Sequence, residues 1–497
     1  MKIFIFRLLS IMIFLIAFIK NLVLFKLTIL LRGIRREKNM SDYQYTDLKY
    51  LEIPLPEELL KLKWYGAFTR MEKVIETKLN QDIPLALKKR LIHEQEIIKR
   101  MPGEYPVSYD QALKMCHENF KDFKDEELQQ LQDQNAVEWI FIEGKAHFRS
   151  DFLDNIIKTR NDYVARLIDQ NKVASRNVNF ELLDQTIKEI KEKKQLTYHF
   201  HLKTGIEIDN LNDDQIIKVH LPLPLENGQV KNFKLIKTTP AYQYLSPGDY
   251  PQRTVYFSQK ASQGTSFSVE YEFDNVIEYQ ELDYNQVLDS QPNFYLQEQA
   301  PHIVFTPYLK QLAKEIVQDE TNNLLKAKKI YEYITTHVNY SFVRNYYCIP
   351  NISEYAALGL KGDCGVQALL FITLCRICQI PATWQAGLYV TPYDIGNHDW
   401  AKFYVAPYGW LYADCSFGGS AYRNGDFQRW QYYFGHLDPF RMPACSEYQF
   451  DLYPPKKFIR QDPYDNQTGE VELEDRGLYL KDYQIKLEVI EAKKVVK

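Results

Sequence analysis

The strongest constraint on the fold is an apolar segment in the second half of the chain. Residues 364–380, CGVQALLFITLCRICQI, are apolar over almost their whole length, and Pro381 follows them as a helix stop. A helix that is apolar on all sides must be buried. Residues 383–390, 399–406 and 409–416 then alternate apolar and polar side chains between Gly and Pro turns, which predicts strands. We therefore predict a buried helix packed on an antiparallel sheet, an α+β arrangement.

The periodicity changes along the chain, which is long enough for three domains of ordinary size. The front of the chain has helical spacing, the middle alternates with period two as in a small antiparallel sandwich, and EVELEDRGLYL and YQIKLEVIEA near the end predict a closing hairpin. The predicted divisions are an apolar leader (1–39), a helical domain (40–190), a β-sandwich-like domain (191–290), the α+β core (291–445) and a C-terminal β-rich extension (446–497).

Residues 1–39 are strongly apolar, and three interpretations of them stay open. The longest uncharged run, Leu8 to Ile19, has 12 residues, whereas a membrane span needs roughly 20. An export signal would carry a small-x-small cleavage site, which the segment lacks. Alternatively the protein starts at Met40, because residues 35–38 can be written in purine-only codons, as a ribosome-binding site would be. The prediction is a cytoplasmic protein, or a membrane-anchored one if residues 1–39 are translated.

Composition argues against several classes of function. The net charge of −4 and the lack of a basic stripe interleaved with aromatic residues argue against nucleic-acid binding. Seven cysteines are few and odd in number, which disfavours a secreted disulfide framework and fits a reducing compartment. No Asp-x-Asp-x-Asp-Gly loop is present, so calcium is not expected. We predict no metal and no cofactor, and the oligomeric state stays open.

Some side chains that resemble ligand sites are interpreted as packing residues. His199 and His201 share a strand face, but no further ligand cluster is near them in sequence. Cys375 and Cys378 have the spacing of a redox or zinc half-site, but no second cysteine pair completes it. The aromatic-rich segment 434–442 is predicted to cap the sheet, with a substrate groove as the alternative.

A candidate nucleophile lies at the start of the apolar helix. Gly362 or Asp363 suits the helix cap, which puts Cys364 in the first turn, where unpaired N–H groups and the helix dipole favour a thiolate. The alternative is a buried structural cysteine.

A candidate base and its partner follow on the predicted strands. His398 and Asp414 lie on neighbouring strands that turn at Gly409, so the carboxylate can orient the imidazole toward the sulfur. Asp399, beside the histidine, should point to the opposite face of its strand.

These motifs resemble those of a known family. Residues 361–389, KGDCGVQALLFITLCRICQIPATWQAGLY, resemble the Gly-x-Cys core of the transglutaminase-like superfamily, whose members share a papain-like fold. The family's His-x-Trp element is matched by residues 398–400 and its Gly-Trp-x-x-x-Asp element by residues 409–414. The resemblance covers about residues 310–420. Two positions depart from the family pattern: Cys415 replaces a frequent proline and Lys402 a frequent acidic residue.

The resemblance implies a fold and a chemistry. The implied fold is α+β: a helical N-terminal domain, a small antiparallel β-sandwich and a papain-like transglutaminase core. The implied reaction is acyl transfer through a thioester on a peptide or protein substrate, with Cys364 as nucleophile, His398 as base and Asp414 as the group that holds the ring. Water as acceptor makes a peptidase or amidase, which we favour, and an amine makes a cross-linking enzyme. The alternative is a non-catalytic peptide-binding or scaffold protein. The residues expected in the oxyanion hole or substrate groove are Tyr340, Gly365 and Trp400.

Overall fold

The computed structural model describes residues 44–169, 180–209, 211–226 and 228–495. Tyr45–Lys497 forms one compact unit. The predicted leader, residues 1–39, lies outside the described residues. Within the described ranges, no helix combines the length and apolarity that crossing a membrane requires.

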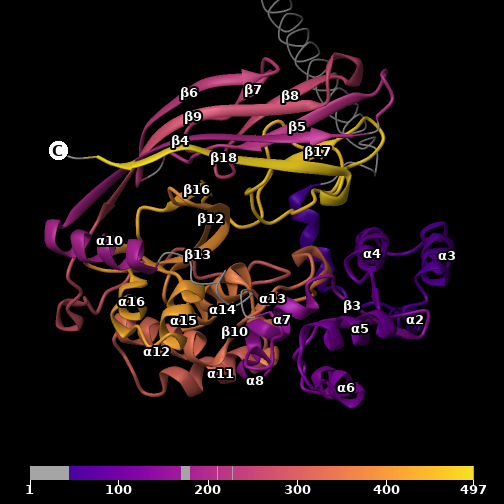
Figure 1. Ribbon diagram of the computed structural model, residues 1–497, viewed down its shortest axis with the longest axis horizontal. Helices are drawn as coiled ribbons and strands as arrows, with labels where there is room; N and C mark the ends of the chain where they lie inside the picture. Colours follow the sequence, from indigo (N-terminus) through magenta and orange to yellow (C-terminus); the bar gives the residue numbers. More distant parts are fainter. Residues whose placement is uncertain (1–43, 170–179, 210, 227, 496–497) are drawn as a thin grey trace, which may run out of the picture. The chain divides into compact units, whose positions relative to one another are not determined.

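The front of the unit is helical, as its spacing predicts (Figure 1). Ser108 begins α5 with the predicted capping box, in which its side chain accepts from the Gln111 N–H and the Gln111 side chain accepts in return. Gly144 makes the predicted turn between two short strands at φ +75°, a conformation that glycine adopts without strain. The elements are η2 (Tyr45–Glu52), α2 (Glu57–Tyr65), α3 (Phe68–Leu79), α4 (Leu85–Glu104), β1 (Val107–Ser108), α5 (Tyr109–Asn119), α6 (Asp125–Asp133), β2 (Trp139–Ile142), β3 (Lys145–Phe148), α7 (Phe152–Thr159), α8 (Asn161–Val164) and α10 (Phe180–Lys193).

Two four-stranded antiparallel sheets form the predicted sandwich. One has the order β17-β5-β8-β7 and the other the order β18-β4-β9-β6. The alternation of buried and half-buried side chains along β9 is the period-two pattern of the sequence. The elements are β4 (Gln195–Ile208), β5 (Ile216–Pro222), β6 (Val230–Thr239), β7 (Tyr244–Leu245), β8 (Thr254–Lys260), η3 (Ala261–Gln263), β9 (Ser266–Glu278), η4 (Tyr284–Gln286), β17 (Glu470–Glu472), η6 (Leu480–Asp482) and β18 (Tyr483–Lys494).

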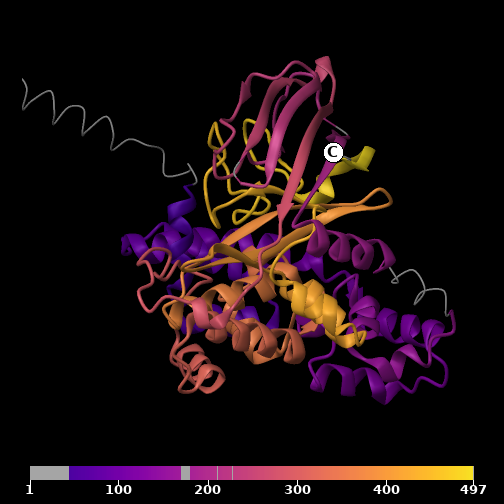
Figure 2. The same cartoon turned by 90° about the vertical axis from the view of Figure 1, so that its left-hand side faces the viewer.

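The predicted closing hairpin at the end of the chain is wrong. The two strands do not pair with each other: β17 pairs with β5 and β18 pairs with β4, in different sheets. Each therefore completes one sheet of the sandwich, and the C-terminal segment, yellow in Figures 1 and 2, returns to strands more than two hundred residues earlier. Edge positions on existing sheets satisfy more backbone groups than an isolated two-stranded ribbon would.

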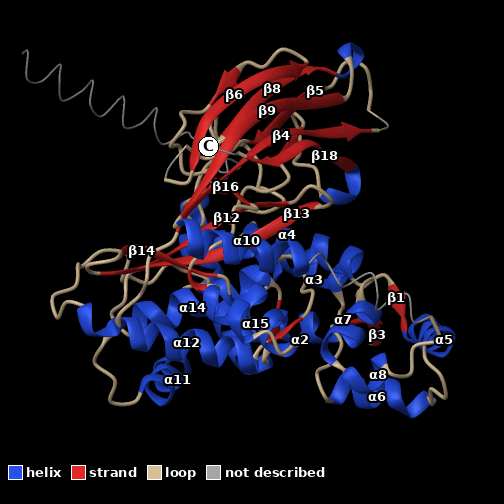
Figure 3. Cartoon of the chain, turned by 60° about the vertical axis from the view of Figure 1, so that its left-hand side comes forward, coloured by secondary structure: helices blue, strands red, loops and turns tan. Residues whose placement is uncertain are grey.

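The core of the second half is a five-stranded antiparallel sheet with the order β15-β14-β13-β12-β16. The apolar helix α14 packs on it, with nearly every side chain buried, as predicted (Figure 3). The elements are α11 (Pro307–Val317), α12 (Asn323–His337), β10 (Asn339–Tyr340), η5 (Tyr346–Cys348), α13 (Ile352–Gly359), β11 (Lys361–Gly362), α14 (Cys364–Ile377), β12 (Ala382–Val390), β13 (Ile395–Val405), β14 (Gly409–Ala413), α15 (Cys415–Arg423), α16 (Phe427–Tyr432), β15 (Phe434–Gly435) and β16 (Arg441–Cys445).

The two faces of this sheet meet different partners. On β13, Phe403 faces α14, where its ring centroid lies 5.6 Å from that of Phe371. The opposite face turns toward the sandwich, where the Tyr412 hydroxyl of β14 donates to Gln229 at 3.3 Å. Odd-numbered residues of β13 thus face the apolar helix and even-numbered residues face away from it.

Candidate functional site

Cys364 is the first residue of α14, as predicted. Asp363 caps the helix and accepts from the Val366 N–H at 3.1 Å, while the Tyr346 hydroxyl donates to the same carboxylate oxygen at 2.5 Å. Cys364 is half-buried. The Val366 N–H is thus taken by the cap, whereas the N–H groups of Cys364 and Gly365 have no partner within the helix and are available to an anionic oxygen beside the sulfur.

His398 and Asp414 lie side by side, also as predicted. Nε2 of His398 lies 2.7 Å from Oδ2 of Asp414, and both residues are buried. Asp414 is held in place because it caps α15 and accepts from the Phe417 N–H at 3.0 Å. Burial lowers the pKa of His398, against the opposing effect of Asp414, so the ring favours its neutral form. With Nε2–H donated to the carboxylate, Nδ1 carries the lone pair that a base needs, and within the described residues it has no hydrogen-bond partner.

A residue that sequence reasoning missed completes this pair. Arg441 of β16 is fully buried and donates to Oδ2 of Asp414 from Nη2 at 2.8 Å and from Nε at 3.2 Å. Its Nη1 donates to Asp438 at 3.0 Å, and its guanidinium lies 4.1 Å from the ring centroid of Phe417. Burial raises the pKa of Asp414, but His398 and Arg441 outweigh it and hold that pKa well below its ordinary value. The carboxylate therefore stays ionised at every pH at which His398 is neutral.

We expect Arg441→Met to lower the free energy of unfolding by about 3–5 kcal/mol, because it leaves two buried carboxylates without their cation. Urea unfolding followed by circular dichroism measures this. Arg429→Met is the matched control: Arg429 is also buried and pairs with two carboxylates, but the side chains of Asp184 and Asp426 are 50% and 27% exposed. The remaining charges are therefore solvated, and the expected loss is below about 1 kcal/mol. Equal losses in the two variants would contradict the buried network as the cause.

The sulfur of Cys364 does not face His398. Sγ lies 3.3 Å from Oδ2 of Asp399, and within the described residues no hydrogen bond joins Cys364 to the His398 ring. The cause is the strand alternation: Asp399 does point to the face opposite His398, as predicted, and α14 brings the sulfur to the Asp399 side. Burial raises the pKa of the Cys364 thiol, and the carboxylates of Asp399 and Asp363 raise it further. In this arrangement the thiol is protonated and donates to Asp399.

Asp399 is itself held by the C-terminal segment. Nε2 of Gln467 donates to Oδ1 of Asp399 at 2.5 Å and to the backbone carbonyl of His398 at 3.2 Å. The carboxyl group of Asp465 lies beside that of Asp399, and the two interact electrostatically. Burial and the nearby Asp363 raise the pKa of Asp399 to about 8. No signal in the sequence pointed to these residues, because they reach the site only by tertiary packing.

The remaining candidates surround these groups. Tyr340 of β10 pairs with Gly362 of β11 in a parallel bridge, which puts its half-buried side chain close to Cys364. Trp400 is fully buried and stacks on His398 with ring centroids 5.8 Å apart, and its Nε1–H donates to Gln385 at 2.8 Å.

Gly365 allows the close approach of two side chains. A Cβ at this position would lie 2.2 Å from the Tyr346 hydroxyl and 2.8 Å from Oδ2 of Asp399. The missing side chain therefore makes room for Asp399 beside the sulfur.

The side chains interpreted as packing residues have ordinary partners. His199 bonds Asp274 and His201 bonds Glu270, each at 2.8 Å across the sheet. Cys375 is buried and Cys378 half-buried, and all seven cysteines are free. In the part of the chain that the structure describes, no group of three or more His, Cys, Asp or Glu side chains is arranged to hold a metal ion.

Comparisons with known proteins agree with the site's position in the chain. Residues 310–415 match the model of the transglutaminase-like superfamily. No curated protein matches the chain.

Among solved structures, a Cytophaga hutchinsonii protein described as a "Putative Cysteine Protease" matches at 15% identity and a TM-score of 0.41, over 61% of this chain and 92% of that one. The periplasmic domain of TgpA from Pseudomonas aeruginosa matches at 12% identity and a TM-score of 0.26, over 49% of this chain and 95% of that one. The same domain bound to ethylmercury matches at 12% identity and a TM-score of 0.24, over 47% of this chain and 94% of that one. The family match spans the helix that begins with Cys364, the strand of His398 and the position of Asp414, directly after β14. Residues 310–415 of this chain are therefore a transglutaminase-like superfamily core.

Proposed function

We propose that the protein is a cysteine-dependent acyl-transfer enzyme that acts on a peptide or a glutamine carboxamide, with Cys364, His398 and Asp414 as its catalytic residues. The observation that carries the proposal is the buried His398–Asp414 pair, because it leaves Nδ1 of the ring unprotonated and, in the described part of the chain, without a hydrogen-bond partner. The carboxylate that holds the ring is itself fixed by the buried Arg441, which keeps it ionised and in place.

The reaction begins when Nδ1 of His398 takes the thiol proton of Cys364. The sulfur then attacks the carbonyl carbon, a C–S bond forms, and the carbonyl oxygen becomes an oxyanion. The Cys364 N–H is suited to bind that oxygen, with the Tyr340 hydroxyl as a second donor. The C–N bond breaks as His398 returns the proton to the leaving nitrogen, which departs as an amine or as ammonia. Asp414 keeps the ring oriented and stabilises its charged form throughout.

The second half of the reaction decides the class of enzyme. Water that attacks the thioester gives a carboxylic acid, and His398 accepts the water's proton and returns it to the departing sulfur. A substrate amine gives a new amide by the same route. We propose hydrolysis, because the peptidase or amidase outcome needs no second substrate site.

The experiment is an activity screen of the full chain with a peptide library and a glutamine-donor library, with and without a primary amine. For hydrolysis we expect the free acid as the product and unchanged substrate consumption when the amine is added. Incorporation of the amine in place of water would overturn the hydrolytic assignment and leave the thioester route in place.

One observation favours a second candidate, a peptide-binding or scaffold protein that retains the fold. The thiol bonds Asp399 rather than His398, and its pKa is raised, which is the opposite of an activated nucleophile. For that candidate, peptides from the same library bind to the wild type and to Cys364→Ala with equal affinity and are not consumed.

A further inference from the structure

Asp399 is a buried carboxyl group that the proposed reaction does not use, although it contacts the reacting atom. The residue is 5% exposed, and its Oδ2 accepts from the Cys364 sulfur at 3.3 Å. Burial of a carboxyl group is costly unless its oxygens are satisfied, and here one oxygen is satisfied by the thiol itself.

The other oxygen is satisfied from the C-terminal segment. Gln467 donates to Oδ1, and the carboxyl group of Asp465 lies beside the same carboxyl group and interacts with it electrostatically. Two neighbouring buried carboxyl groups favour a state in which one of them keeps its proton, because ionising both adds a large repulsion. The side chain of Asp399 is thereby fixed from three directions: the sulfur, the amide and the second acid.

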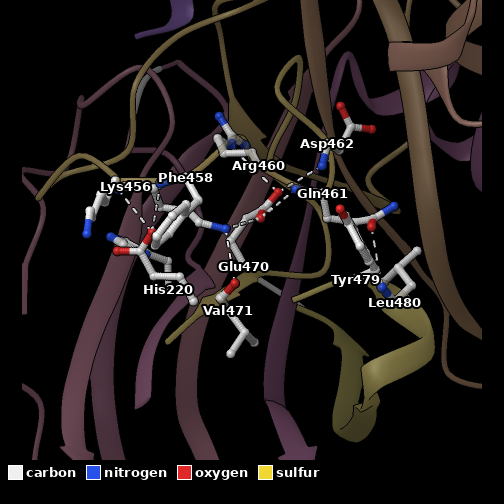
Figure 4. A network of polar contacts seen from close by, with 12 residues as sticks. His220, Lys456, Phe458, Arg460, Gln461, Asp462, Glu470, Val471, Tyr479 and Leu480 are labelled. Carbon is white, nitrogen blue, oxygen red and sulfur yellow. Dashed lines mark hydrogen bonds and ion pairs between the residues drawn. The ribbon is translucent and has the colours of Figure 1, made fainter. Parts of the chain in front are cut away.

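This part of the C-terminal segment, residues 460–470, is itself anchored to the sandwich (Figure 4). Glu470 of β17 accepts from the backbone N–H groups of Gln461 at 2.8 Å and Asp462 at 2.9 Å and from Nζ of Lys456 at 2.8 Å. Arg460 donates to the backbone carbonyl of Asp465. A cavity of about 100 Å³ lies beside Asp465 and Gln467, so the segment closes the Asp399 side of the site but leaves a small polar space next to it.

The charged and titratable groups around Asp399 are mostly acidic. They come from α14 and its cap, from β10, η5 and β16, and from residues 448–470, and among these groups only Arg460 is a cation. Negative charge and a hydrogen bond from the thiol both favour the protonated sulfur over the thiolate. The groups are Cys364, Asp363, Tyr340, Tyr346, Cys445, Tyr448, Asp462, Asp465 and Arg460.

We propose that Asp399, held by Asp465 and Gln467, restrains the nucleophile: it keeps Cys364 as a neutral thiol turned away from His398, and this hydrogen bond must be given up before the sulfur can react. The inference rests on the proposed function, since it assigns a role to Asp399 only if Cys364 is the nucleophile. It makes the C-terminal segment part of the site, although that segment lies outside the family match.

The test is the pH profile of alkylation of Cys364 by iodoacetamide in the full chain, followed by peptide mass mapping. For Asp399→Asn, which keeps the shape and removes the charge, we expect the midpoint of the profile to fall by about one pH unit. At a pH below both midpoints the thiolate fraction rises about tenfold. The rate rises only about threefold, because nucleophilicity falls with the pKa of the thiol.

A second variant, Asp465→Asn, keeps the test decisive if Asp399→Asn does not fold. Asp465→Asn removes the neighbouring acid from the C-terminal segment and should shift the midpoint in the same direction by a smaller amount. The matched control is Asp394→Asn, an exposed acid in the turn before β13 whose carboxylate accepts from the Ile395 N–H, and its profile should equal that of the wild type. Thermal melts identify which variants are folded.

The outcomes separate the inference from the proposed function. Midpoints in both folded variants that equal the wild-type value, or that move upward, overturn the restraint by Asp399. If Cys364→Ala still turns over substrate, the proposed function fails whatever the alkylation profile shows. If turnover needs Cys364 but the profiles coincide, only the role of Asp399 is lost.

Discussion

Cys364→Ala is expected to abolish turnover of any amide that the wild-type protein consumes, by at least about 10³-fold. No other group in the proposed mechanism forms a bond to the substrate, so loss of the sulfur removes the thioester route entirely. Steady-state release of the amine measures the loss. Intact mass spectrometry adds a direct readout, since the wild type should gain the mass of the acyl group during turnover and the variant should not.

Cys378→Ala is the matched control for this result. Cys378 is the other half-buried cysteine and lies at the opposite end of the same helix, α14. Its removal should leave turnover within about twofold of the wild type. If Cys364→Ala were active and Cys378→Ala inactive, the nucleophile would be Cys378, at the other end of the helix, and the proposed mechanism would be refuted.

Asp414→Asn is expected to lower kcat by about 10³- to 10⁴-fold with little change in KM. The asparagine amide can donate to Nε2 of His398, which favours the tautomer with its proton on Nδ1. That tautomer has no lone pair toward the thiol and cannot take its proton. The variant also removes the negative charge that stabilises the charged ring during the reaction. Steady-state kinetics across a pH series measures both parameters.

Asp438→Asn separates this effect from a general loss of the buried network. Asp438 bonds the same arginine, Arg441, but does not contact the His398 ring. We expect Asp438→Asn to lower stability and to leave kcat per folded molecule nearly unchanged. A fall in kcat equal to that of Asp414→Asn would mean that the arginine, rather than the hydrogen bond to His398, carries the effect.

Features that depend on neighbouring residues could be predicted from the sequence. The cap at Asp363 and the position of Cys364 in the first turn follow from a few adjacent residues, since a helix terminus is a local structure. The pairing of His398 with Asp414 follows from two strands joined by a short turn, where the register leaves few choices. The period-two pattern of the sandwich has the same local origin.

Contacts between distant segments could not be predicted in this way. Arg441 comes from the edge strand β16, and Gln467 comes from a loop that follows it, so neither has a fixed relation in sequence to the residue it contacts. For the same reason, the sequence predicts that the last two strands, β17 and β18, pair with each other. In the structure β17 pairs with β5 and β18 pairs with β4. Hydrophobic patterning shows that a strand has a buried face, but not which element covers it.

From its sequence alone, this chain is determined to have a buried apolar helix that begins at a cysteine, an alternating sheet behind it, and a histidine and an aspartate brought together by two adjacent strands. Only the tertiary structure decided that the sulfur lies on the side of Asp399, because the side chains of a strand alternate and the packing of α14 selects one face. It also decided that the buried Arg441 and Gln467 of the C-terminal segment complete the site. Burial brings these groups into contact with Asp414 and Asp399, and their positions along the chain do not predict that contact.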